Sequence, residues 1–398
     1  MSTTLLNILF YITFFAFSFG QLGRISFLRQ EINGYWYEIP LLLSIIFLIL
    51  QYGLEPIKES FKRFAMVYIF AIYLTATTLF SLPWFGETDN YVALLYLARV
   101  ALYFMYFVYA GYHLREEPPI KKLFINGYWN ILIINILAGV LQYFVFPDLS
   151  KLYYEGWDPH LYRLFGLYFD PVVAGAAYGL LLLFTLLSSY KMSKRLIIRI
   201  AVIAVLLIFM LFTFSRGTYI AIVLTLGVLA LRSKALYVLM GFAAIFTLAL
   251  FLLPKPVGEG VNLLRSSTID SRIVDYQEGI SIWKKNPIIG IGYNHIRAVK
   301  KNAKDMSPTT VNVSHAGSAF HSSFITILVT GGLVGFVLFV MALVELAQLG
   351  QYSFYVVLFL SIISLFDNIL LHPFMLFLFL STITLHMFNP SDIQPLDF

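Results

Sequence analysis

Long apolar stretches separated by short polar segments run along nearly the whole chain. Crossing a hydrocarbon layer as a helix takes roughly 20 apolar residues. A backbone inside a membrane must satisfy its own hydrogen bonds, and no segment alternates as the strands of a barrel would. The pattern therefore predicts an all-α polytopic membrane protein. About twelve stretches are long enough to be its spans, approximately at residues 5–21, 38–54, 64–82, 91–113, 123–146, 166–189, 196–214, 217–231, 235–253, 319–345, 352–367 and 371–388.

Composition excludes several classes of protein. A chain of 398 residues with 60% hydrophobic and 12% charged residues does not fit a soluble globular protein. The net charge of +6 is spread over loops, so it does not indicate nucleic-acid binding. The absence of cysteine excludes disulfides, thiolate metal sites and a cysteine nucleophile. The first apolar stretch has no basic leader and no small-residue cleavage site, so we interpret it as a retained span.

The distribution of lysine and arginine predicts the orientation. These residues gather on alternate short loops, as expected of loops on the cytoplasmic side. We therefore expect a multi-pass protein of the inner (plasma) membrane with both termini in the cytoplasm. The long connection 254–318 then faces outward. We predict two parts of the chain: N-terminal spans in residues 1–150, and a core in residues 151–398 that includes this long connection. The inner loops hold Lys58, Lys62, Arg63, Arg115, Lys121, Lys122, Lys191, Lys194, Arg195, Arg232 and Lys234.

The outer connection contains a predicted helix and turn. Residues 273–285 have amphipathic spacing and end before Pro287, and a glycine-punctuated turn follows at 288–293. These segments could pack on the bundle as a lid without contacting substrate, or lie on the membrane and cap a cavity. Both interpretations stay open. In the second, the cavity is surrounded by the outer ends of spans six, seven, eight and ten, and Trp283 and Tyr293 contact the substrate.

Three arginines and one histidine fall on the predicted outer side: Arg163, Arg216, Arg272 and His321. Arg216 lies in a Ser-Arg-Gly turn between two spans, where a simple turn needs no charge. Guanidinium groups bind phosphate oxygens in pairs and keep their charge. An imidazole titrates near neutral pH and can take a proton from a sugar hydroxyl. Together these residues predict an enzyme that handles a lipid-linked diphosphate.

Each of these residues also has a structural interpretation. Arg216 could anchor in lipid headgroups, and His321 could cap a helix. The glycine and proline after Arg163 indicate a broken or re-entrant entry into the sixth span. Arg163 could instead form a salt bridge with Asp158 or Asp170, and Arg272 could form one with Asp270 or Asp275.

Other polar residues bear on whether a metal is needed and on which spans line a cavity. No pair of carboxylates stands where a divalent ion would be held beside a diphosphate, so we predict no metal and no cofactor, and arginines stabilise the leaving group. Arg99, inside the fourth span, costs roughly 2.5 to 3.5 kcal/mol to insert, so it should face a cavity or a partner, or serve the fold. Asp367, Asn368 and His372 add polar groups at the outer end of the last two spans.

At this point the chain resembles the O-antigen ligase and O-antigen polymerase family of bacterial envelope glycosyltransferases. The resemblance lies between about residues 163 and 343, and the first 150 residues carry no recognised motif. Asp170 and Val172 depart from the asparagine-rich version expected there. The matching segments are Arg163-Leu164-Phe165-Gly166 with Asp170-Pro171, Phe214 to Ile220, Ser271-Arg272-Ile273 with the helix to Trp283, Asn286 to Gly292, and His321-Ser322-Ser323 with Gly332 and Gly335.

The resemblance implies a GT-C-like helical core and a metal-independent, inverting transferase. Such an enzyme takes a glycan from an undecaprenyl diphosphate carrier and passes it to a sugar hydroxyl. By carry-over, Arg216 and Arg272 hold the diphosphate, His321 acts as general base or positions the acceptor, and Arg163 assists binding. The implied partners are the lipid-linked glycan donor, a glycan or lipid A core acceptor and membrane lipids, and no nucleic acid.

Alternatives stay open at this point. A ligase and a polymerase differ in the acceptor, which is a lipid A core sugar in one and another lipid-linked repeat in the other. A flippase or transporter also has about twelve spans, but the halves do not match as repeats and the polar residues lie at one face instead of the midplane. A peptidoglycan polymerase of the shape and division family would need an acidic residue in the outer loop, where Asp275 and Glu278 are present.

Overall fold

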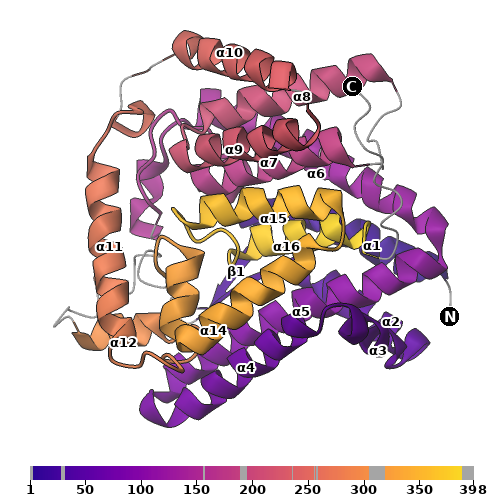
Figure 1. Cartoon of the computed structure of the whole chain (residues 1–398), viewed down its shortest axis with the longest axis vertical. Helices are drawn as coiled ribbons and strands as arrows, with labels where there is room; N and C mark the ends of the chain where they lie inside the picture. Colours follow the sequence, from indigo (N-terminus) through magenta and orange to yellow (C-terminus); the bar gives the residue numbers. More distant parts are fainter. Residues whose placement is uncertain are drawn as a thin grey trace.

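The computed structural model describes residues 3–27, 32–155, 157–188, 195–234, 236–254, 256, 259–303 and 319–387. Each predicted apolar stretch coincides with an α-helix, so the structure is predominantly helical (Figure 1). These helices are α1 (Thr3–Phe17), α2 (Glu38–Tyr52), α4 (Ala65–Ser81), α5 (Glu87–Glu116), α6 (Lys121–Val145), α7 (Pro171–Leu187), α8 (Leu196–Phe212), α9 (Arg216–Arg232), α10 (Leu236–Leu252), α14 (Ser323–Ala347), α15 (Gln351–Ser364) and α16 (Pro373–Thr384).

More polar helices lie between them. They are α3 (Glu55–Arg63), α11 (Ser267–Trp283) and α12 (Ile296–Ala303). The helix predicted at 273–285 is therefore present as α11, which begins earlier. Figure 1 shows α11 running across the ends of the bundle helices. Part of the predicted outer loop, residues 304–318, and two predicted inner-loop lysines, Lys191 and Lys194, lie outside the described residues.

Helix length limits the count of membrane spans. Among the described residues, four segments are long and apolar enough to cross a membrane, and a fifth is reached if α2 and α3, bent by 98°, form one span. The four are Ala65–Trp84, Glu87–Glu116, Pro118–Val145 and Ser323–Ala347. A helix of 17 residues, such as α7 or α8, is about 25 Å long, less than the roughly 30 Å of a hydrocarbon core. Twelve spans therefore stay a prediction.

A small hairpin interrupts the helical pattern after α1. Strand β1 (Arg24–Phe27) pairs antiparallel with β2 (Ile32–Tyr35), with Arg24 opposite Tyr35. The apolar pattern did not predict this hairpin, because strands of four residues are too short to show a clear alternation. The hairpin places polar side chains beside α5.

Helix α7 lies at the centre of the core. It is buried on nearly all sides, as expected of a helix that is apolar all round. It packs against α8, α9, α15 and α16. A Cβ atom at Gly179 would stand 2.2 Å from Phe359 Cζ, so glycine there permits the close contact of α7 with α15.

A backbone break in α14 holds the turn that follows α11. Gly332 has φ 64° and ψ −168°, which interrupts the helix. The turn that follows α11 supplies the hydrogen bonds: Leu333 N–H donates to Pro287 O at 2.8 Å, and Gly292 N–H donates to Thr330 O at 2.9 Å. Gly290, with φ +72°, packs against the backbone of the same break. The glycine-rich turn is therefore docked into α14, and α11 packs beside it.

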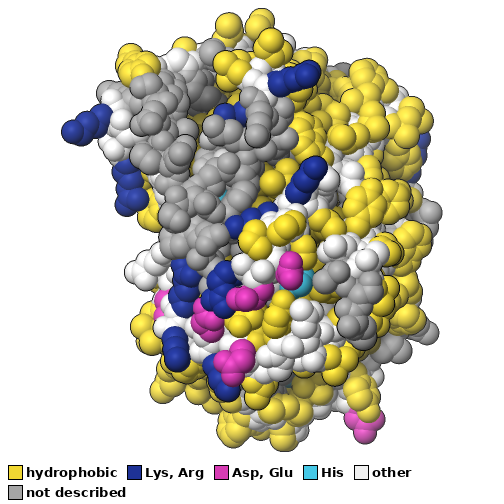
Figure 2. Space-filling model, turned by 90° about the vertical axis from the view of Figure 1, so that its right-hand side faces the viewer, with side chains coloured by type: hydrophobic (Ala, Val, Ile, Leu, Met, Phe, Trp, Pro, Cys, Tyr) yellow, Lys and Arg dark blue, Asp and Glu magenta, His cyan; other side chains and the backbone are white. Residues whose placement is uncertain are grey.

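Figure 2 shows the face of the molecule that lies at the right of Figure 1, where α2 and α3 lie. Lysine and arginine side chains gather there with acidic ones among them, and hydrophobic side chains border them. Helix α3 contributes Lys58, paired with Glu55 at 2.8 Å, and Glu59, paired with Arg115. These residues belong to the loops that the charge bias assigns to the cytoplasm.

Candidate active site

His321 stands directly before α14 and is paired with Asp275 of α11. Asp275 Oδ2 accepts hydrogen bonds from the His321 backbone N–H at 2.7 Å and from its Nδ1 at 3.1 Å. This arrangement orients the ring so that Nε2 is left to exchange a proton. The hydrogen bond to Asp275 raises the pKa of His321, although burial works in the opposite direction. The side chain is 37% exposed, so a ligand can reach it.

A lysine holds Asp275 in turn. Lys300 of α12 lies 3.2 Å from Asp275 Oδ1 and 3.4 Å from Glu278, with its ammonium over the ring of Phe320 at 4.2 Å. Burial raises the pKa of Asp275, but the hydrogen bonds from His321 and the charge of Lys300 outweigh it and hold that pKa below its usual value. The sequence suggested Asp275 only as a pairing partner of Arg272 or as a catalytic acid. Its supporting role with Lys300 was missed.

Arg272 lies one turn before Asp275 on α11. Its Nη2 is 3.2 Å from Asp367 Oδ2, so its partner is neither Asp270 nor Asp275. Burial and the nearby charge of Asp170 raise the pKa of Asp367, and Arg272 opposes this. Tyr276, next on the same face, donates from its hydroxyl to His321 O at 2.9 Å and Leu365 O at 2.6 Å. The face of α11 thus joins the start of α14 to the end of α15.

Arg216 is the first residue of α9. Ser215 caps the helix, and its side chain accepts from Thr218 N–H. The guanidinium of Arg216 donates to Arg265 O at 2.9 Å and to Leu263 O at 3.3 Å. Arg216 and Arg272 are close enough for their charges to repel each other. A helix N-terminus with two adjacent guanidinium groups is a favourable place for a phosphate.

Arg163 is buried and braces the turn before Arg216. Its Nε donates to Thr213 O at 2.9 Å and its Nη2 to Phe214 O at 3.4 Å, and Phe214 has a strained φ of 51°. Its Nη1 donates to His160 Nδ1 at 3.4 Å. Its guanidinium is held by these hydrogen bonds and forms no ion pair with Asp158 or Asp170, although the charge of Asp170 acts on it from further away. Burial and the charge of Arg265 lower the pKa of Arg163 to about 10.

One segment of the chain is similar to a known family. Residues 201–340, from α8 into α14, match the family model described as O-antigen ligase. This segment, called the O-antigen ligase segment below, is similar to that family. The O-antigen ligase segment contains Arg216, Arg272, Asp275 and His321, and it leaves out Arg163. No curated protein matches the chain.

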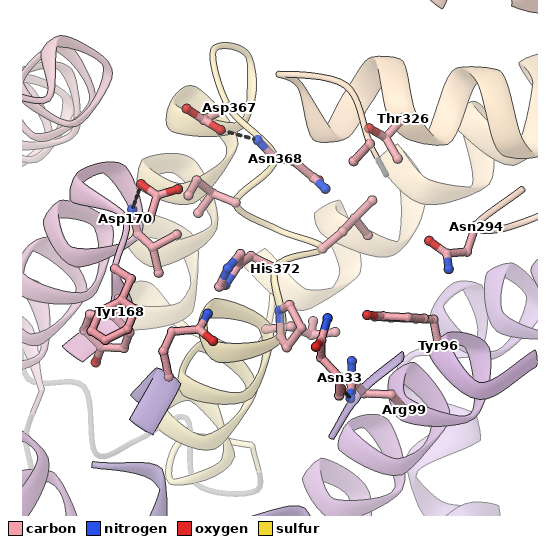
Figure 3. A pocket seen from close by; sticks show the side chains of 18 of the residues that line it. Asn33, Tyr96, Arg99, Tyr168, Asp170, Asn294, Thr326, Asp367, Asn368 and His372 are labelled. Atoms are coloured by element: carbon pink, nitrogen blue, oxygen red, sulfur yellow. Dashed lines mark hydrogen bonds between the residues drawn. The ribbon is translucent and has the colours of Figure 1, made fainter. Parts of the chain in front are cut away.

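A cavity of about 270 Å³ opens beside His321 (Figure 3). The O-antigen ligase segment supplies only one part of its wall, which includes His321 and the predicted substrate contact Tyr293. Arg163, Arg216, Arg272 and Trp283 do not line it. The other lining residues come from the hairpin, from α5, from the approach to α7 and from the α15–α16 connection; among them are Arg24, Asn33, Tyr35, Tyr96, Arg99, Trp157, Asp158, His160, Tyr168, Asp170, Asp367, Asn368 and His372.

The local sequence explains how the approach to α7 is built. Asp170 caps α7 by accepting from Val172 N–H at 2.6 Å and Val173 N–H at 3.2 Å, and Pro171 starts the helix. A short 3₁₀ turn, η5 (Gly166–Tyr168), precedes it. The predicted break before the sixth span is therefore present.

The remaining predicted contact, Trp283, ends α11. Its Nε1 donates to Pro287 O at 3.0 Å. It packs on a small core that includes Ile291 and Phe320. A contact of Trp283 with substrate stays a prediction. Among the described residues, no three histidine or acidic side chains converge as a metal site would require.

Proposed function

We propose that the protein is a membrane glycosyltransferase that moves a glycan from an undecaprenyl diphosphate carrier to a sugar hydroxyl. The observation that carries the proposal is the His321–Asp275 hydrogen bond, at 3.1 Å, in the same cluster as Arg272 and Arg216. The family match supports O-antigen ligase or polymerase-type chemistry. A polytopic, GT-C-like bundle with the site on the outer side of the inner membrane is part of the proposal.

The proposed reaction is a single displacement. His321 Nε2 takes the proton of the acceptor hydroxyl while its oxygen attacks the anomeric carbon of the donor. The bond from that carbon to the diphosphate oxygen breaks, and the electron pair leaves with the carrier diphosphate. Arg216 and Arg272 stabilise the charge on this leaving group, so no metal ion is required. Attack opposite the leaving group inverts the anomeric carbon.

The arrangement of Asp275 argues against the alternative in which it is the catalytic acid. One of its oxygens is paired with Lys300 and the other with His321. Both oxygens are therefore engaged in orienting a neighbour. This favours the histidine as the group that moves the proton.

The test is reconstitution of the purified protein in liposomes with an undecaprenyl diphosphate-linked oligosaccharide. Lipid A core and a second lipid-linked repeat are supplied in separate reactions as acceptors, with chelator present. Transfer to the lipid A core with release of carrier diphosphate would identify a ligase, and a longer lipid-linked glycan would identify a polymerase. Translocation of the donor with no new glycosidic bond would identify a flippase and contradict the proposal.

A further inference from the structure

The cavity beside His321 has chemistry that a diphosphate does not require. One wall carries the carboxylates of Asp158, Asp170 and Asp367. Figure 3 shows Asn33, Tyr96 and Arg99 on another side of the same space, with His372 between the two groups. The arginines assigned to the diphosphate do not line it. Asp367 is neutralised by its ion pair with Arg272, but Asp158 and Asp170 keep this wall acidic, which is unfavourable for a phosphate and favours a different ligand.

The walls hold hydrogen-bonding capacity that the described part of the chain leaves unused. Four lining side chains have a buried polar atom with no hydrogen-bond partner among the described residues: Gln21 Oε1, Arg99 Nη1, Tyr168 OH and His372 Nδ1. Leaving a buried polar atom unsatisfied costs about 1 to 3 kcal/mol. These atoms are enclosed within the walls, so they show that the walls are polar, as suits a ligand rich in donors and acceptors, but they do not mark its contacts.

Aromatic rings stand among these polar groups. The guanidinium of Arg24 lies over the ring of Trp157, 4.9 Å from its centroid. The guanidinium of Arg99 lies over the ring of Tyr96, 4.8 Å from its centroid. Arg99 is anchored from behind by Glu38, at 2.6 Å, so this wall is fixed in place. Each guanidinium covers one face of its ring, so a pyranose, which has apolar C–H faces and a rim of hydroxyls, would contact the ring at its edge or its other face. The volume is slightly below the roughly 300 Å³ of drug-sized pockets, enough for one or two sugar rings.

We propose that this cavity is the subsite of the acceptor sugar, a neutral pyranose whose hydroxyl is presented to His321. The inference rests on the proposed glycosyl transfer and assigns the acceptor's place within it. Asp367 is paired with Arg272 and Arg99 with Glu38, and among the other lining charges the carboxylates of Asp158 and Asp170 outnumber Arg24. Burial lowers the pKa of His160 to about 3 and of His372 to about 4, so neither adds positive charge at neutral pH. An acidic sugar is therefore disfavoured.

The placement gives a role to the part of the chain outside the family match. Asn33 of β2 and Tyr96 and Arg99 of α5 lie well before residue 201. The O-antigen ligase segment thus supplies the proton acceptor, and the N-terminal part selects the sugar.

The first experiment measures sugar binding to the purified protein without donor. Glucose, N-acetylglucosamine and glucuronic acid are compared by saturation-transfer NMR. We expect the neutral sugars to bind and glucuronic acid to bind more weakly. Tyr96→Ala should raise the dissociation constant about fivefold to tenfold, as the loss of one ring contact does. Tyr91→Ala, an exposed tyrosine on the same helix, is the matched control and should change nothing.

A second variant tests the same cavity with a substitution that is not expected to disturb folding. Asn294 lines the cavity with φ 61°, a conformation that glycine adopts freely, so Asn294→Gly removes the side chain without backbone strain. In transfer assays, Tyr96→Ala and Asn294→Gly should raise the acceptor KM and leave the donor KM unchanged. If the wild type is active and the acceptor KM is unchanged in both variants, this inference is overturned and the proposed function is kept. Neutral sugar binding in a wild type that transfers no glycan would instead overturn the proposed function and keep the sugar site.

Discussion

At the scale of single residues, each candidate group depends on a neighbour that orients it. His321 is held by Asp275, Arg272 by Asp367, and the turn before Arg216 by Arg163. Acidic partners offset the charges of His321 and Arg272, whereas Arg216 and Arg272 repel each other. Substitution at this scale should separate proton transfer from donor binding.

Replacing His321 with alanine should reduce transfer by about 10² to 10⁴-fold, the usual contribution of a general base. Donor binding should be largely kept, because the arginines remain. Transfer rate and binding of the lipid-linked donor are measured on the same preparation. Full activity in the variant would exclude His321 as the base.

The pH dependence tests the His321–Asp275 pair. His321 accepts a proton only when neutral, so activity should fall as pH drops below its raised pKa. Asp275→Asn removes the negative charge that favours the imidazolium. The acidic limb of the pH–rate profile should therefore move to lower pH, with a lower maximum rate. Glu278→Gln, which removes the other acidic partner of Lys300, is the control and should leave the limb in place.

Substitutions of Arg216 test whether a positive charge alone is enough to bind the diphosphate. Arg216→Lys keeps the charge but loses the planar fork, so it should recover little of the activity lost in Arg216→Ala. Donor affinity should fall in both variants. Transfer is measured in metal-free buffer with chelator. Near-complete rescue by lysine would show that geometry at the phosphate is unimportant.

At the scale of elements, the docking of the glycine-rich turn into α14 fixes the distance between α11 and His321. A Cβ at Gly332 would stand 2.2 Å from Ile288 O, and the residue has φ +64°. The His321–Asp275 pair is therefore assembled with the help of a backbone contact that a side chain cannot replace.

Gly332→Ala should destabilise the protein by about 1 to 3 kcal/mol or more and reduce transfer, because both strain and a clash arise. Gly53→Ala is the matched control: Gly53 has φ +58°, but no atom lies within 4 Å of the added Cβ. Thermal unfolding in detergent and transfer activity are compared. Equal unfolding temperatures in the two variants would mean that the docked turn has no part in stability.

At the scale of the whole molecule, the charge bias predicts that α3 and α11 face opposite sides of the membrane. The chain has no cysteine, so single cysteines can be introduced for labelling. Lys285→Cys should react with an impermeant maleimide in intact spheroplasts, and Lys62→Cys only after lysis. Both side chains are exposed, so reactivity reports the side and not burial. The reverse pattern would invert the proposed topology.

The sequence by itself determined the helices, because apolar length is a local property that survives into the fold. It also indicated the break before α7 from Gly166 and Pro171. It singled out Arg216 and His321, and it predicted that Arg163 and Arg272 lie on the same side of the membrane. The short hairpin was missed because its strands carry too few residues to show a pattern.

Only the tertiary structure decided the partners and the cavity. Asp275 and His321 are 46 residues apart, and Arg272 and Asp367 are 95 apart. Nearby carboxylates such as Asp270 looked equally suitable for Arg272 in the sequence. The wall formed by Asn33, Tyr96 and Arg99 carries no motif. Pairings of this kind depend on which helix ends meet, and that is set by the packing of the whole bundle, which no local pattern encodes.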